Sequence, residues 1–192
     1  MLRGFLIICD SPIIAKCKLV SAILCPFLIF LIATAMTRNL EAEEAGALRL
    51  IQAIPLHNVE GRIDHMAVGL KGERLFIAAL GNNTVEIVDL RAGKHIGTIT
   101  GLHEPQGVGF VPEFNRIFVA NAKGGACDVF DGSSFKRIKS VKFSDDADNI
   151  RYDPVTRRVY VGYGSGALGI IDAASGDQLG EIKLDGHPNP SN

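Results

Sequence analysis

The sequence predicts an all-β fold, because one strand-like phrase recurs three times along the chain. In each copy an aromatic residue stands within a short apolar run, at Phe76, Phe118 and Tyr160, which are 42 and 42 residues apart. In each copy an aspartate ends the next apolar run, at Asp89, Asp131 and Asp172, which are 42 and 41 residues apart. Self-similarity at this period with strand patterning is typical of propeller blades or another repeat array.

Each predicted repeat contains four short apolar runs that are separated by turn residues. The three repeats span residues 62–102, 103–144 and 145–186. In the second repeat the runs are 107–110, 117–121, 127–130 and 136–141. Strands of this length, with glycine, proline and serine between them, predict an antiparallel meander. Four strands in a unit of about 42 residues make one blade of a β-propeller, and residues 62–186 show no helical period.

Residues 1–35 are predicted to be a signal peptide or a membrane anchor that precedes the fold as a hydrophobic helix. Basic residues (Arg3, Lys16 and Lys18) come before an uncharged run from Leu19 to Ala35. The run ends in Ala33-Thr34-Ala35, a pattern of small residues that is typical of a cleavage site. Its 17 residues are slightly long for a signal core and at the low edge for a spanning helix, so both interpretations stay open, with cleavage preferred.

In both interpretations the repeats are exported, so we expect a periplasmic or extracellular domain. The membrane would be contacted only through residues 19–35, if they are not cleaved. Residues 36–47, which contain three glutamates, are predicted to be a polar linker. The partial propeller then runs over 48–192, and we expect residues 48–56 to add one strand before the first repeat.

Charge and cysteine content limit the partners of the repeats. The whole chain has a net charge of −1 and residues 1–35 carry +2, so the remainder carries −3. A mildly acidic domain disfavours nucleic acid as a partner. Three of the four cysteines lie in residues 1–35, which leaves Cys127 alone in the repeats. Cys127 lies within a predicted strand, so we expect a small core residue rather than a nucleophile.

Several phrases of the repeats carry a family resemblance. They are Gly61-Arg-Ile-Asp-His65, residues 79–89, Glu104-Pro-Gln-Gly-Val108, Phe118-Val-Ala-Asn121 and residues 145–153. Together they resemble the YVTN-type (YncE-like) β-propeller proteins of bacteria, whose namesake tetrapeptide falls at residues 118–121 and 160–163. The resemblance covers residues 48–192 and implies an exported seven-bladed propeller that acts as a binding or surface protein. Related propellers include a lactonase and the haem d1 domain of a nitrite reductase.

Three repeats are fewer than the seven blades that the resemblance implies. Seven blades of this size need roughly 290 residues, whereas this chain has 192. We therefore expect about three blades of an incomplete ring, and a truncated propeller of this kind leaves a face of each end blade uncovered. Exposed apolar faces predict that residues 36–192 self-associate.

Polar residues recur at the entrance to the first strand of each repeat. One column holds Asp64, Gln106 and Asp148, and a second holds His103, Asp145 and His187. His65 follows Asp64 directly. The first strand of a propeller blade is innermost, so these side chains would surround the mouth of the central channel, where they could bind a small polar ligand or a divalent metal. The alternative is that they satisfy backbone groups at turns and strand ends.

Two further columns are assigned to folding. The first holds Arg74, Arg116 and Arg158, which open the second strand of each repeat. We expect them to form solvated ion pairs with nearby carboxylates rather than an anion site. The second holds Asp89, Asp131 and Asp172, which we expect to accept backbone N–H groups in the turns that follow.

No nucleophile–base pair, phosphate-binding loop or zinc-ligand spacing is present in the sequence, so enzyme activity has no positive support. The favoured function is therefore an exported propeller that serves as a scaffold for a small ligand or a protein. The alternative is a metal-assisted hydrolase of lactonase type that uses the Asp and His residues of the channel mouth. A divalent metal is the one candidate cofactor.

Overall fold

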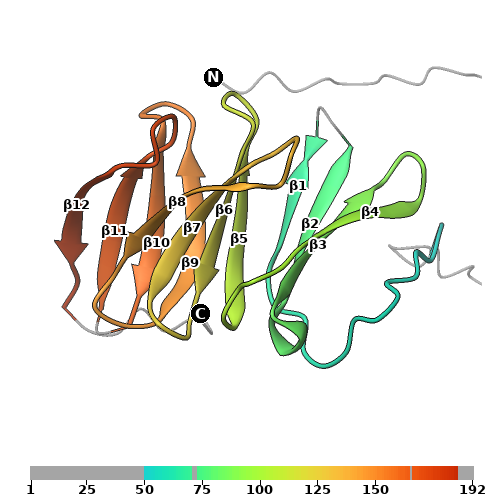
Figure 1. Cartoon of the computed structure of the whole chain (residues 1–192). Coiled ribbons are helices and arrows are strands. Elements are labelled where there is room, and N and C mark those ends of the chain that lie inside the picture. The colour runs from blue at the N-terminus through green and yellow to red at the C-terminus, as the bar shows by residue number, and fades with distance from the viewer. Residues whose placement is uncertain (1–49, 71–72, 165, 186–192) are drawn as a thin grey trace, which may run out of the picture. The chain divides into compact units, whose positions relative to one another are not determined.

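A computed structural model describes residues 50–70, 73–164 and 166–185, which form three antiparallel four-stranded sheets (Figure 1). These ranges contain no α-helix, and the 3-10 turn Leu80–Asn82 is the helical element with described bounds, so the all-β prediction is confirmed. No helix among them is long and apolar enough to cross a membrane. The predicted signal or anchor (1–35), the linker (36–47) and His187 lie outside the described residues.

Each sheet lies within one of the three repeats. Blade 1 consists of β1 (Met66–Gly69), β2 (Arg74–Ala79), β3 (Thr84–Asp89) and β4 (Lys94–Ile99). Blade 2 consists of β5 (Pro105–Val111), β6 (Arg116–Asn121), β7 (Ala126–Asp131) and β8 (Arg137–Lys142). Blade 3 consists of β9 (Ala147–Asp153), β10 (Arg158–Tyr163), β11 (Ala167–Asp172) and β12 (Gln178–Lys183). Strands pair in sequence order within every blade, so each blade is the expected meander.

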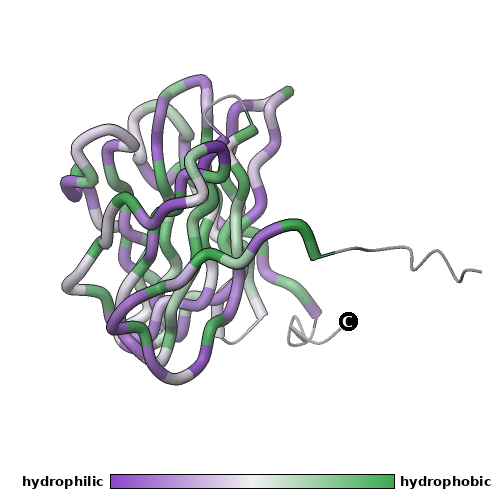
Figure 2. Tube along the Cα trace, turned by 90° about the vertical axis from the view of Figure 1, so that its right-hand side faces the viewer, coloured by the Kyte–Doolittle hydropathy of each residue, from purple (hydrophilic) through white to green (hydrophobic). Residues whose placement is uncertain are grey.

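The three blades stand side by side with blade 2 in the middle (Figure 1). The first strands are neighbours, because β5 contacts both β1 and β9. The second strand of each blade is almost wholly hydrophobic over residues 75–79, 117–120 and 159–161, and hydrophobic residues run through the interior of the array (Figure 2). This is the arrangement of consecutive blades in an incomplete β-propeller, with the first strand of each blade on the inside.

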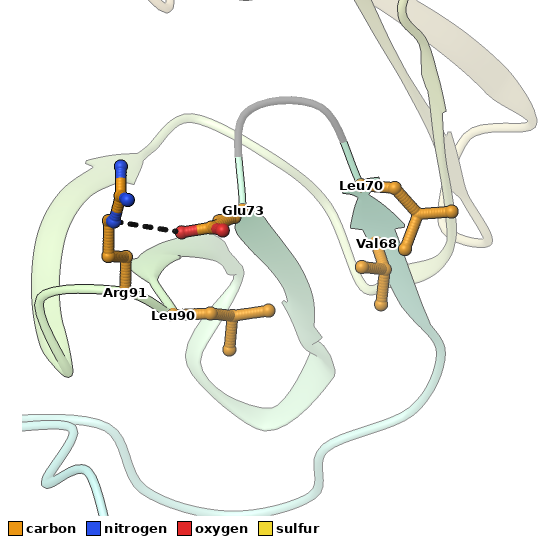
Figure 3. Close-up of a pocket in the computed structure, with 5 residues that line it drawn as sticks. All are labelled: Val68, Leu70, Glu73, Leu90 and Arg91. Atoms are coloured by element: carbon orange, nitrogen blue, oxygen red, sulfur yellow. Dashed lines mark ion pairs between the residues drawn. The ribbon is translucent and has the colours of Figure 1, made fainter.

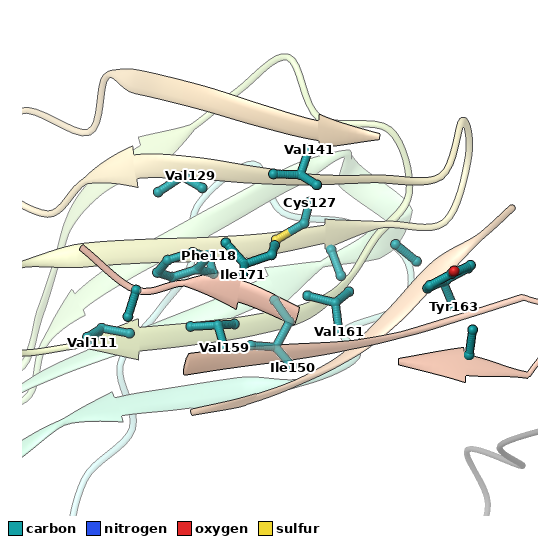
Figure 4. Close-up of a cluster of buried hydrophobic side chains, with 14 residues drawn as sticks. Val111, Phe118, Cys127, Val129, Val141, Ile150, Val159, Val161, Tyr163 and Ile171 are labelled. Carbon is teal, nitrogen blue, oxygen red and sulfur yellow. The ribbon is translucent and has the colours of Figure 1, made fainter. Parts of the chain in front are cut away.

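The hydrophobic core lies between blades rather than within them. Between blades 1 and 2, the ring of Phe76 stacks on that of Phe110 at a centroid distance of 4.9 Å. Between blades 2 and 3, Phe118 packs with Val159 and Ile171 in a second cluster (Figure 4). Blade 2 therefore buries apolar side chains on both of its faces, and it does so because it has a neighbour on each side.

Close approach of the inner strands requires glycine at particular positions. A β-carbon on Gly107 of β5 would lie 2.0 Å from the carbonyl oxygen of Asp148 at the start of β9. A β-carbon on Gly109 would lie 2.7 Å from the Ile150 side chain, and one on Gly69 would lie 2.9 Å from the Phe110 ring. These three residues set the distance between neighbouring blades.

The expected strand at residues 48–56 is wrong for the part that the structure describes. Residues 50–56 form no strand, and Leu50 and Ile51 are exposed to solvent. Pro55 removes a backbone donor from this segment, and none of the described strands pairs with it. The apolar run therefore has the composition of a strand, but it does not pair with any strand that the structure describes.

Candidate functional site

The inner ends of β1, β5 and β9 bring one predicted polar column together. Asp64 and His65 directly precede β1, while Gln106 and Asp148 are the second residues of β5 and β9. The N–H of His65 donates to the carbonyl oxygen of Gln106 at 3.3 Å, and Gly107 lies against the Asp148 carbonyl. We call these four side chains, Asp64, His65, Gln106 and Asp148, the inner-strand cluster.

Asp64 is the best-connected member of the inner-strand cluster. Its Oδ2 lies 2.6 Å from Nη2 of Arg62, and its Oδ1 lies 3.1 Å from Nδ1 of His65. The backbone N–H of Asp64 also donates to the carbonyl oxygen of Ala78 at 2.9 Å, which holds this segment along β2. Asp64 therefore both orders the approach to β1 and holds the side chains of Arg62 and His65 in place.

Asp148 lacks a comparable set of partners. Its Oδ1 is buried and has no hydrogen-bond partner within the described part of the chain. Burial is the main factor that raises the pKa of the Asp148 carboxyl, and the negative charges of Asp146 and Asp64 raise it further. His65 and Arg62 act in the opposite direction. A ligand that brings a hydrogen-bond donor or a positive charge would stabilise the ionised form of this partly buried carboxyl group.

The second predicted column occupies different surroundings. His103 is exposed, and its backbone N–H donates to Oδ1 of Asn121 at 3.0 Å. Asp145 is exposed and accepts the N–H of Asp146 at 2.8 Å. Burial is the main factor that raises the pKa of Asp146, and the negative charge of Asp145 raises it further. The acidic character of the inner ends therefore includes Asp146, which the repeat columns did not single out.

No group of three or more His, Cys, Asp or Glu side chains in residues 50–70, 73–164 and 166–185 is arranged to hold a metal ion. The inner-strand cluster instead offers carboxylate oxygens and one imidazole to a ligand. Around Asp148, the negative charges of Asp64 and Asp146 are opposed by His65 and by the guanidinium of Arg62. A small cationic or donor-rich ligand fits this balance.

The aspartate column has the folding role that the sequence indicated. Oδ1 of Asp131 accepts the backbone N–H groups of Ser133 and Ser134 at 3.1 and 2.8 Å. Asp172 does the same one repeat later, and Asp89 accepts the N–H of Ala92 at 2.7 Å. These backbone donors lower the pKa of Asp131 and of Asp172. They are turn residues.

The arginine column is less uniform than expected. Arg116 forms the expected ion pair, with Nη1 at 3.3 Å from Oδ2 of Asp131. Arg74 instead donates to the carbonyl oxygen of Gly132 at 2.5 Å, and its guanidinium lies over the rings of Phe76 and Phe110. Arg74 therefore joins blade 1 to blade 2, because a planar cation can stack on aromatic rings while it donates from its edge.

The structure also shows functional candidates that the repeat columns missed. Glu86 and Asp128 are buried carboxylates in the third strands of blades 1 and 2, and they stand one repeat apart. A charged residue in the middle of an apolar strand was the available signal in both cases. By contrast, Cys127 beside Asp128 is the expected core residue, because burial raises the pKa of its thiol and disfavours the thiolate.

Comparison with known proteins supports the fold alone. No protein-family model matches the chain, and no curated protein matches it. Among solved structures, the chain is similar to a chain of hydrazine synthase from Kuenenia stuttgartiensis, with a TM-score of 0.60 and 24% sequence identity. The match covers 64% of this chain and 36% of the other, so this chain spans about a third of the length of that chain.

Proposed function

We propose that this chain is an exported β-propeller scaffold of the YVTN type that binds a small ligand at the inner-strand cluster. Three consecutive four-stranded blades support the propeller, and the recurring phrases at residues 118–121 and 160–163 support the family. The basic residues before the uncharged run 19–35 support export. The ligand is a small molecule that carries an amine or several hydrogen-bond donors.

The observation that carries the proposal is the buried, unpartnered Oδ1 of Asp148 beside Asp64 and His65. A buried acceptor without a donor costs free energy, so the unpartnered Oδ1 of Asp148 lowers stability unless a ligand supplies the donor. A bound ammonium group would supply the donor and offset the charge that Asp64, Asp146 and Asp148 share.

The proposal is tested by isothermal titration calorimetry of the full chain with 1,4-diaminobutane at low ionic strength. We expect saturable binding that weakens at least about tenfold in Asp148→Asn, since a charge-assisted hydrogen bond is worth about 1.5–3 kcal/mol. Asp185→Asn removes the same charge from an exposed residue of the C-terminal segment and should leave the affinity unchanged. Equal weakening in both variants would indicate non-specific attraction and reject the site.

The same titration with zinc chloride and calcium chloride tests the hydrolase alternative. A lactonase-type mechanism requires saturable metal binding, together with hydrolysis of a simple lactone that Asp148→Asn abolishes. That pair of results would replace the binding proposal with a metal-assisted hydrolase. Export is tested separately, by N-terminal sequencing of the protein recovered outside the cytoplasm: a first residue after Ala35 supports a signal peptide, and Met1 supports an anchor.

A further inference from the structure

A polar pocket lies on blade 2, mainly over its outer two strands and away from the inner-strand cluster. It has a volume of about 340 Å³. Arg137, Ser140 and Lys142 of β8 line it together with Asn121 and Asp128. We call it the β8 pocket. Its size falls within the range of small-molecule sites, and all of its lining residues belong to one blade or to the connection that leads into it.

The β8 pocket contains a buried carboxylate that is only half satisfied. Asp128 is 4% exposed. Nδ2 of Asn121 donates to Oδ2 of Asp128 at 3.1 Å, and Nη1 of Arg137 donates to the same oxygen at 3.4 Å. Oδ1 of Asp128 is buried and has no partner within the part of the chain that the structure describes. Unsatisfied buried acceptors are rare in folded proteins, so we expect a donor from outside the described residues to bind Oδ1 of Asp128.

Blade 1 shows which donor is missing. Its equivalent carboxylate, Glu86, is 1% exposed, and both of its oxygens are satisfied. Thr84 donates to Oε1 at 2.5 Å, while Thr98 donates to Oε2 at 2.7 Å and Nε2 of His95 lies 2.7 Å from that oxygen. One repeat later the position of Thr84 is occupied by Ala126, which has no hydroxyl. Ala126 itself lines the β8 pocket, so a ligand can reach the place where blade 1 carries its donor.

The remaining lining residues give the pocket a positive charge. Lys123 and Lys142 are exposed and, among the described residues, neither forms an ion pair with a carboxylate. Nζ of Lys142 has a long contact of 3.4 Å with the carbonyl oxygen of Gly124. With Arg137 these residues supply three cations around one buried carboxylate, so the pocket attracts anions while its floor accepts a hydrogen bond.

We infer that the β8 pocket binds a small hydroxylated organic anion. The carboxylate or phosphate of the ligand pairs with Lys123 and Lys142, and one of its hydroxyl groups donates to Oδ1 of Asp128. The chemical class is that of sugar acids and sugar phosphates, which carry both features. The inference does not rest on the inner-strand cluster, because the two sites share no residue and differ in the sign of their charge.

The test is isothermal titration calorimetry of the full chain with gluconate and acetate, which share a carboxylate and differ in hydroxyl groups. We expect gluconate to bind about tenfold more tightly than acetate, because one hydrogen bond to a charged acceptor is gained. Lys142→Gln should weaken both ligands several-fold. Lys136→Gln, which removes the same charge from an exposed lysine in the β7–β8 turn, should weaken neither.

Two variants test the role of Asp128 directly. Asp128→Asn keeps an acceptor for Asn121 and Arg137 and places an amide nitrogen where Oδ1 was, so the preference for gluconate over acetate should disappear. Ala126→Thr restores the donor of blade 1 and should reduce the same preference while it raises the melting temperature. The second variant decides the matter if the first does not fold. An unchanged preference in the folded variants would show that only water satisfies Oδ1 and would overturn the inference, as would equal weakening by Lys136→Gln.

Discussion

The inner strands of blades 1 and 2 present equivalent residues to different surroundings. Val108 of β5 packs against blade 1 and is 6% exposed, whereas Met66, the same position one repeat earlier, is 59% exposed. Phe110 stacks on Phe76, while its counterpart Val68 is 50% exposed. The four residues are all apolar. The sequence of a blade therefore specifies an apolar face, and burial of that face depends on the neighbouring blade.

The uncovered face of blade 1 contains an apolar hollow. Val68, Leu70 and Leu90 line a pocket of about 380 Å³, beside an ion pair in which Nε of Arg91 lies 3.6 Å from Oε2 of Glu73 (Figure 3). No strand of the described residues packs on this face. An apolar patch rimmed by charge is typical of a contact surface. We therefore expect substitutions on this face to change self-association, whereas substitutions at the interfaces between blades change stability.

The opposite end of the array shows the same contrast in another column. Phe76 and Phe118 are fully buried against the following blade, whereas Tyr160 in the third repeat is only half-buried. Its hydroxyl suits a position that reaches water. Comparison of covered and uncovered positions of one column therefore separates the energy of the blade from the energy of the interface.

The largest expected effect comes from the aromatic column. Phe118→Ala should lower the free energy of unfolding by about 3–5 kcal/mol, because it leaves a cavity between blades 2 and 3. Tyr160→Ala should cost less than half as much, since one side of that ring has no blade against it. Urea denaturation followed by circular dichroism measures both. Equal losses would show that the third blade is covered in solution.

Glycine at the inner strands gives the next largest effect. Gly107→Ala should destabilise the fold by about 1–3 kcal/mol, because the new methyl group would collide with the Asp148 carbonyl oxygen and force β5 and β9 apart. Gly180→Ala on β12 is the matched control, since a β-carbon there meets no atom within 4 Å. The control should be neutral or slightly stabilising in the same denaturation experiment. A destabilising Gly180→Ala would contradict the open outer strand.

Much of the fold could be predicted because it is periodic. The recurrence of Phe76, Phe118 and Tyr160 located the second strands of the three blades, and the aspartates that follow located their turns. The error at residues 50–56 arose because an apolar run shows that a strand is compatible with the sequence but does not supply a pairing partner. A strand forms only when it pairs with another segment, and the sequence of residues 50–56 gives no information about such a partner.

The candidate sites were predictable to a smaller extent. The column of Asp64, Gln106 and Asp148 follows from repeat register, and the structure brings these positions to one end of the inner strands. The β8 pocket does not follow from register, because it depends on a difference between repeats. Thr84 in one blade and Ala126 in the next leave one carboxylate satisfied and the other open. A comparison that looks for residues shared by all three repeats misses a site that depends on a residue in which the repeats differ.

The third effect concerns association rather than stability. Val68→Ser should change the free energy of unfolding by less than about 0.5 kcal/mol, as is usual for exposed positions. It should weaken self-association, because it places a hydroxyl in the apolar hollow of blade 1. Light scattering over a range of protein concentrations measures this, and Val155→Ser, which changes an exposed valine in the β9–β10 turn, is the control. Association that is equally strong in both variants would exclude this face as the contact surface.

The smallest expected effect compares a carboxylate of the inner-strand cluster with one in an exposed turn. Burial raises the pKa of Asp148 above its ordinary value of 3.8, so the folded state binds the proton more readily than the unfolded state. Stability is therefore lost as the pH rises from 3.8 through the higher folded pKa, and Asp148→Asn should be more stable than the parent at neutral pH but not below pH 3.8.

Asp131 should change stability with pH in the opposite direction, because backbone N–H donors lower its pKa. Asp131→Asn should be less stable than the parent at neutral pH, and this difference should vanish as the pH falls through the lowered pKa. Urea denaturation of both variants at neutral pH and below pH 3.8 measures the two differences, and a loss of stability in Asp148→Asn at neutral pH would show that its carboxylate already has a donor in the protein.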